Sequence, residues 1–217
     1  MFISKLQIGQ RMKKIFNYYE RILAKLTHLD GVPSLLIRLY LSPIFIQAGW
    51  NKLINFDSTV AWFANPDWGL GLPFPELLAG MAAGTEFIGG WLILIGLATR
   101  IIAIPLAFTM AVAAFTVHWD NGWLAIADAS SWMADGTIIL NESVLAATAK
   151  KEAAIAILQE HGNYEWLTSS GSFTILNNGI EFAATYFVMV LVLLFSGAGR
   201  YTSIDYYIHK SVAQQIS

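Results

Sequence analysis

The sequence predicts an all-α, polytopic membrane protein: a four-helix bundle with an N-terminal interfacial helix and a long, helix-containing outer loop between spans three and four. Two observations predict this class. Of the 217 residues, 56% are hydrophobic and 13% are charged, and the mean hydropathy is +0.53, so a soluble domain would expose too much apolar surface. Apolar runs of about 20 residues, the length that crosses a bilayer as a helix, also recur along the chain.

Continuous hydrophobicity and the loop residues that interrupt it define the spans. We predict them at 33–54, 76–97, 100–118 and 174–196. The turn between the second and third spans is so short that these helices form an antiparallel hairpin. The spans make one membrane domain, 33–205, with an outer insertion at 119–173, a basic segment before it at 1–32, and a tail after it at 206–217.

The segment 1–32 is predicted to form a basic amphipathic helix that lies on anionic lipid, because apolar residues recur at spacings of three and four with lysine and arginine between them. A partly disordered basic tail is the alternative. The segment lacks the continuous apolar core and cleavage site of a cleavable signal. Basic residues also mark the turn at 99–100 and the tail, so both termini are predicted to be cytoplasmic. The outer insertion includes an alanine-rich stretch, 142–159, that favours a helix.

Composition excludes several classes of chemistry. The chain has no cysteine, which excludes disulfides and thiolate metal sites. Its net charge of -2 gives no basic excess that would attract nucleic acid. Neither a Gly-rich phosphate loop nor a nucleophile elbow is present, so hydrolase and ATPase functions have little support.

Glu86 is the most informative residue because it lies about 15 Å from either end of the second predicted span. A charge at that depth costs several kcal/mol in order of magnitude unless protein, water or a ligand stabilises it. Alanines and glycines surround it in sequence, and such small residues let another helix approach closely. A glutamate that only fixes helix packing is the alternative to a functional one.

Other polar residues on the spans are candidate partners of Glu86. Arg38 and Lys52 share one face of the first span, although Arg38 could instead snorkel to lipid phosphates and Lys52 could anchor the outer interface. Asn177 and Glu181 share a face of the last span, and His118 ends the third. In an antiparallel bundle, Lys52, Glu86, His118 and Glu181 would converge on a cavity that opens outward.

Metal binding is weakly indicated. His118 and His161 are the candidate ligands, for copper, but no pair of residues has a recognised ligand spacing.

The chain resembles the DoxX family of small four-helix membrane proteins. The resemblance lies in Arg38 and Glu181 and in the segments AGWNKL at 48–53, EFIGG at 86–90, GLATR at 96–100 and GAGRYTSID at 197–205. A narrower resemblance, to the HvfX branch, lies in AWFANPDWGLGLP at 61–73, HWDNGW at 118–123 and HGNYEWL at 161–167. This branch implies a bacterial inner-membrane partner of a precursor peptide and its modifying proteins, in the maturation of copper-binding, ribosomally made peptides.

Three functions remain open at this point. The leading hypothesis is an accessory inner-membrane protein that helps to mature, handle or export a copper-binding peptide, with an outward pocket around Glu86 and Glu181. The first rival is a membrane subunit of a quinone-linked oxidoreductase, in which Glu86 or Glu181 relays protons while Lys52 or Arg38 orients the quinone oxygens. The second rival is a lipid- or small-solute-binding protein. Whether the chain is itself an enzyme stays open.

Overall fold

The computed structural model describes residues 2–134 and 142–216, with the side chains of 11–134 and 142–215. In chain order its α-helices are α1 (Phe2–Leu26), α2 (Gly31–Ile54), α3 (Phe56–Ala64), α4 (Pro75–Ile95), α5 (Thr99–Val112), α6 (Glu142–Leu145), α7 (Ala147–His161), α8 (Tyr164–Leu167), α9 (Glu181–Ser196) and α10 (Ile204–Ile216). The described residues form no β-strand beyond one isolated bridge, which confirms the all-α class. Residues 1, 135–141 and 217, which belong to the predicted N-terminal segment, outer insertion and tail, lie outside the described residues.

Helices α2, α4, α5 and α9 pack around one apolar core. Each contributes side chains that are fully buried: Leu41 from α2, Ile93 from α4, Leu106 from α5 and Leu193 from α9. The largest contacts join α2 to α4 and α5 to α9. Because lipid tails are as apolar as leucine, such helices are held together by close packing and polar contacts more than by escape from water.

Within the part of the chain that the structure describes, three helical segments are long and apolar enough to cross a membrane: Gly31–Ile54, Pro75–Ile95 and Thr99–Val117. The third consists of α5 and a π-helical turn, Ala113–Val117, that continues it. Helix α9 is apolar but has only 16 residues, or about 24 Å of helical rise. These helices confirm a polytopic helical protein that associates with a lipid bilayer.

The fourth predicted span was placed too early, because α9 begins at Glu181 and not at residue 174. The backbone N–H groups of 177–181 donate hydrogen bonds to the carbonyls of 122–125 instead of forming a helical turn. Asn178 has a φ of 60°, a left-handed conformation that also ends a helix. Pairing with a distant loop thus replaces the first two predicted turns.

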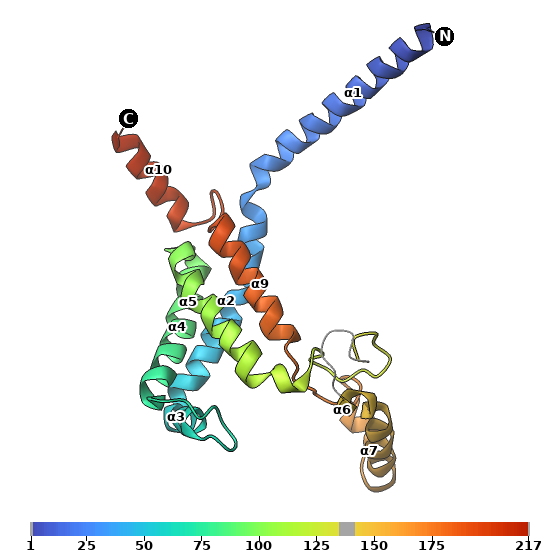
Figure 1. The fold of residues 1–217 in the computed structure, drawn as a ribbon, viewed down its shortest axis with the longest axis vertical. Helices are drawn as coiled ribbons and strands as arrows, with labels where there is room; N and C mark the ends of the chain where they lie inside the picture. Colours follow the sequence, from blue (N-terminus) through green and yellow to red (C-terminus); the bar gives the residue numbers. More distant parts are fainter. Residues whose placement is uncertain (1, 135–141, 217) are drawn as a thin grey trace.

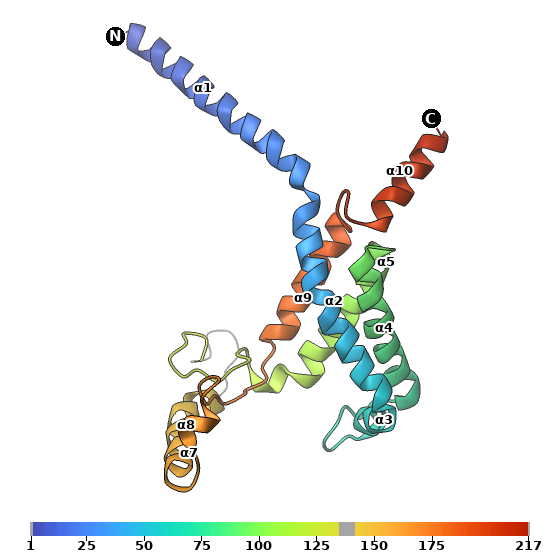
Figure 2. The ribbon, with the colours of Figure 1, turned by 180° about the vertical axis from the view of Figure 1, so that it is seen from behind.

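The bundle has two distinct ends. Helices α1 and α10 project from the end that carries both termini, whereas α3 and α6 to α8 lie at the opposite end (Figure 1, Figure 2). We call these the termini end and the loop end. The cytoplasmic location of the termini end stays a prediction.

The segments outside the core are helical where the sequence predicts helices. Helix α1 leads away from the core (Figure 1), and its side chains from Arg11 onward are exposed. Its placement on anionic lipid stays a prediction. The predicted helix at 142–159 is found as α6 and α7, which are separated at Ala146.

Candidate functional site

An ion pair joins the first two membrane-spanning helices near the loop end. Lys52 Nζ on α2 lies 2.5 Å from Glu86 Oε2 on α4. The Glu86 side chain is 6% exposed, and the Lys52 side chain is 27% exposed. The partner that stabilises the buried carboxylate is therefore Lys52, and the lysine forms the open side of the pair.

Two glycines bring α2 and α4 close enough for this contact. A Cβ atom on Gly49 would lie 2.3 Å from the backbone nitrogen of Phe87, and one on Gly90 would lie 2.8 Å from the backbone nitrogen of Ile46. Any side chain at either position would push the backbones apart. Small residues are the usual means by which membrane helices approach this closely. Gly90, which is near Glu86 in sequence, therefore has the packing role that the sequence predicts for the small residues around Glu86.

The Lys52–Glu86 pair keeps its net charge when a proton moves between its two groups. It is neutral overall when the lysine is an ammonium and the glutamate a carboxylate, and equally neutral when the proton has moved to the glutamate. Removing either partner, or adding or removing one proton, leaves a net charge between the helices, which is unfavourable in apolar surroundings.

Arg38 forms a separate polar centre at the termini end. It is 1% exposed. The side chain therefore points into the protein, and the alternative prediction that it reaches lipid phosphates is wrong. Its guanidinium donates to four backbone carbonyls, those of Ile93 at 2.8 Å, Leu94 at 2.8 Å, Ala198 at 2.7 Å and Thr202 at 3.1 Å. The last carbonyls of a helix have no intrahelical partner, and a cation is favourable there. Arg38 thus joins the end of α4 to the segment that follows α9.

Asp205 also lies at the termini end, where it binds the start of α5. It is not among the predicted site residues. Its carboxylate accepts the backbone N–H groups of Ala98 at 2.7 Å and Thr99 at 2.9 Å, which are unpaired donors at the start of α5. The sequence signal was an acidic residue two positions after Ser203, which itself accepts the backbone N–H of Tyr206 at 3.3 Å. A side chain at Gly96 would collide with Arg38 and Ser203, so this turn requires glycine.

The remaining candidates fix the loop that precedes α9. Each of them contacts a backbone group: Glu181 Oε2 accepts the N–H of Ala125 at 3.0 Å, Asn177 donates to the carbonyl of Leu124 at 2.7 Å, and His118 Nδ1 lies 2.9 Å from the carbonyl oxygen of Asn178. Glu181 is the first residue of α9 rather than a group within a longer span. The structure therefore brings Lys52 and Glu86 together, whereas Glu181 and Asn177 contact backbone groups at 121–125 and His118 contacts Asn178.

The metal candidates do not form a cluster. Among the described residues, no group of three His, Cys, Asp or Glu side chains is placed to hold a metal ion. His118 follows the π-helical turn after α5, whereas His161 ends α7 and lies 3.6 Å from Glu160. Copper contact by these histidines stays a prediction.

The fold and the ion pair define a polytopic helical membrane protein with a charged contact buried between its first two spans. Residues 34–119 match the sequence profile of the DoxX family, so this segment is similar to DoxX membrane proteins. The matched segment includes Arg38, Lys52, Glu86 and His118 and ends before Asn177 and Glu181. The narrower HvfX resemblance stays a prediction.

Three relatives show the same partial similarity. The "Putative oxidoreductase CatD" of Bacillus subtilis is 35% identical over 86 residues, 40% of this chain and 60% of the relative. "Inner membrane protein YphA" of Escherichia coli is 36% identical over 88 residues, 40% and 60% of the two chains. An "Uncharacterized protein" of Haemophilus influenzae is 30% identical over 98 residues, 43% and 62%. The chain thus spans about three fifths of the length of each relative, and no solved structure matches it.

Proposed function

We propose that the protein is a bacterial inner-membrane subunit of a quinone-linked oxidoreductase, with Lys52 and Glu86 as its proton-exchanging pair. The observation that carries the proposal is the 2.5 Å contact between Lys52 Nζ and Glu86 Oε2, with the carboxylate buried and the lysine open on one side. The names of two relatives, "Putative oxidoreductase CatD" and "Inner membrane protein YphA", support the class and the location.

In this function a quinone oxygen meets the ammonium group of Lys52. Reduction of a quinone to a hydroquinone consumes two electrons and two protons, and a partner redox protein with a flavin or metal centre supplies both electrons. Lys52 donates each proton to a quinone oxygen. Each transfer leaves the carboxylate of Glu86 without its counter-charge in an apolar span, and this cost favours uptake of the next proton from water at the loop end.

The other charged candidates have different roles in this proposal. Arg38 directs four hydrogen bonds to backbone carbonyls, so it holds the helices rather than a quinone. Glu181 accepts a backbone N–H from the outer loop, so it fixes that loop rather than relaying protons. The proton exchange is assigned to one pair.

Quinone binding by the purified, full-length protein tests this function. The probe is a short-chain ubiquinone titrated into detergent-solubilised protein, with tryptophan fluorescence as the readout because Trp50 lies two residues from Lys52. Lys52→Met is expected to weaken binding about tenfold, as befits loss of a charge-assisted hydrogen bond. Glu76→Gln is the matched control, since Glu76 is an exposed carboxylate on the same helix as Glu86.

Two results would reject the quinone proposal. One is the absence of saturable quinone binding by the wild-type protein. The other is equal affinity of the wild-type and Lys52→Met proteins. A Glu76→Gln protein that binds as the wild type does is expected and shows that the effect belongs to the buried pair.

A second function, assistance to the maturation, handling or export of a copper-binding peptide, is favoured by the loop end. Trp132 and Trp166 are 69% and 71% exposed there, and exposed tryptophans are typical contact residues of interfaces. Deletion of the gene should lower the yield of mature peptide outside the cell; unchanged yield and modification would reject this function. Unaltered copper binding by a His118→Ala, His161→Ala double variant would reject those two ligands.

A further inference from the structure

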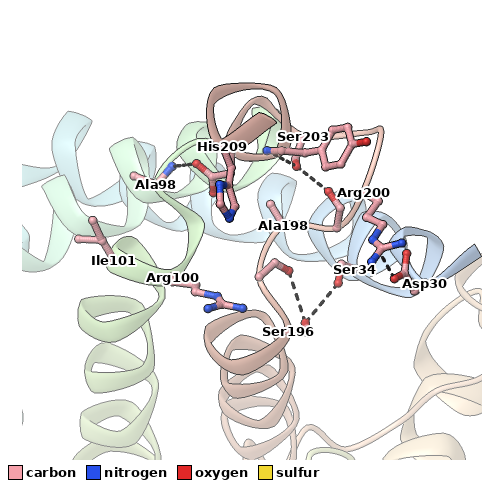
Figure 3. A pocket seen from close by; sticks show the side chains of 14 residues that line it. Asp30, Ser34, Ala98, Arg100, Ile101, Ser196, Ala198, Arg200, Ser203 and His209 are labelled. Atoms are coloured by element: carbon pink, nitrogen blue, oxygen red, sulfur yellow. Dashed lines mark hydrogen bonds and ion pairs between the residues drawn. The ribbon is translucent and has the colours of Figure 1, made fainter. Parts of the chain in front are cut away.

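A cavity of about 670 Å³ opens at the termini end, between the start of α5, the end of α9 and the first turns of α10. It is separate from the Lys52–Glu86 pair, and none of the predicted site residues lines it. Figure 3 shows Arg100 and Arg200 on two sides of the cavity, with His209 above it and Ser34 and Ser196 below. Cationic and hydroxyl groups thus face one space from four segments of the chain.

The acidic groups of this cavity are already engaged. Asp30 Oδ2 forms an ion pair with Arg200 Nε at 3.2 Å, and Asp205 accepts the two backbone N–H groups at the start of α5. Arg100 donates to the carbonyl of Phe195 at 3.1 Å and, among the described residues, forms no ion pair. Arg100 therefore keeps both its positive charge and further N–H donors available for an anion.

Apolar surface continues from the cavity along the bundle. Ile101 lines the cavity and is 73% exposed, and Ile104 and Phe108 follow at spacings of three and four with exposures of 59% and 69%. These positions share one face of α5. On α9, Phe195 beside the cavity is 76% exposed and Val188, seven residues earlier, is 57% exposed. A ligand with a charged head and long apolar chains matches this surface, whereas a soluble ion would use only the cavity.

We propose that this cavity binds the phosphate group of an anionic phospholipid, with Arg100 as the main contact and the acyl chains along α5 and α9. The cavity lies at the end of two membrane helices, the level at which headgroups are found, and basic pockets between such helices commonly hold anionic lipids. Arg100 directs its remaining N–H donors at the phosphate. This proposal does not depend on the quinone proposal, which concerns the opposite end of α2 and α4.

Native mass spectrometry of the full-length protein, titrated with phosphatidylglycerol in detergent micelles, measures this binding. Phosphatidylcholine, whose headgroup has no net charge, is the lipid control. Arg100→Gln is expected to weaken phosphatidylglycerol binding about fivefold. Lys150→Gln, which removes one positive charge from an exposed position on α7 at the loop end, is expected to bind as the wild type does.

A second variant protects the test against misfolding. His209 is exposed on α10, so His209→Gln is expected to preserve the fold and to weaken binding about twofold, as loss of one hydrogen bond does. Equal binding of phosphatidylglycerol by wild-type, Arg100→Gln and His209→Gln proteins would overturn the proposal. So would an equal loss in Lys150→Gln, which would mean attraction by charge alone, or full displacement of the lipid by equimolar glycerol phosphate, which would mean a soluble ligand.

Discussion

Replacing Arg38 with lysine tests how strongly one side chain holds the termini end together. Arginine presents several N–H donors in a rigid plane, and lysine has the same charge on one flexible nitrogen. The substitution therefore keeps the positive charge beside the end of α4 and changes only the hydrogen-bond geometry. Any loss of stability reports on the contacts to the four carbonyls and not on the charge.

The size of the effect follows from those contacts. The four carbonyls lie 2.7 to 3.1 Å from three different nitrogens of Arg38. A lysine ammonium donates at most three hydrogen bonds, all from one atom, so one or two of the four are lost. A hydrogen bond that involves a charged group contributes roughly 1.5–3 kcal/mol. We therefore expect Arg38→Lys to lower the free energy of unfolding by about 3 kcal/mol.

Unfolding by sodium dodecyl sulfate in mixed detergent micelles, followed by far-ultraviolet circular dichroism, gives the measurement. Arg100→Lys is the matched control, because Arg100 is exposed and donates one hydrogen bond to a carbonyl; its effect is expected to stay within about 0.5 kcal/mol. An Arg38→Lys protein as stable as the control would refute the assignment of Arg38 to the joint between α4 and the segment after α9.

Three further predictions use the same unfolding assay. Gly49→Ala should destabilise by about 1–3 kcal/mol because a Cβ meets the α4 backbone, whereas Gly84→Ala, with open space around it, should be neutral or slightly stabilising; equal effects would contradict the close approach. Asp205→Asn should cost about 1 kcal/mol as an N-terminal capping contact weakens, and no change would contradict that role. In a double-mutant cycle, Lys52→Met and Glu86→Met should couple by about 1 kcal/mol, toward the lower end of the roughly 0.5–3 kcal/mol found for residues in contact, because Lys52 is 27% exposed; additive effects would argue against the ion pair.

The sequence predicts the parts of the fold that depend on local composition. Apolar runs indicate α2, α4 and α5 to within a few residues, because a bilayer imposes length and polarity on each span separately. The depth of Glu86 and the glycines around it likewise predict a buried carboxylate with a helix packed against it. Lys52 and Arg38 lie on one helical face, so periodicity alone could not choose between them.

Contacts between residues far apart in the sequence account for the differences between the predicted and the observed structure. The stretch before Glu181 is apolar enough to extend a span, but its N–H groups pair with 122–125, some 50 residues earlier in the chain. Lys52 and Arg38 lie at opposite ends of the bundle because different helix ends meet there. The contacts of Asp205 and Arg100 depend on the same packing of helix ends. No local sequence pattern predicts which helix ends pack together.

The four carbonyl partners of Arg38 become available in two stages during synthesis of the chain. Two of its carbonyl partners lie within 60 residues, at Ile93 and Leu94, but the other two, at Ala198 and Thr202, lie 160 and 164 residues away. At ribosomal rates of about 5–20 residues per second, the distant pair emerges roughly 5 to 20 s after the near pair. During that interval a newly inserted hairpin contains a buried cation with half of its acceptors. If translation stalls in the outer loop, the guanidinium of Arg38 therefore lacks two of its carbonyl acceptors within the membrane. Quality-control proteases can use a defect of this kind to distinguish the unfinished chain from the finished protein.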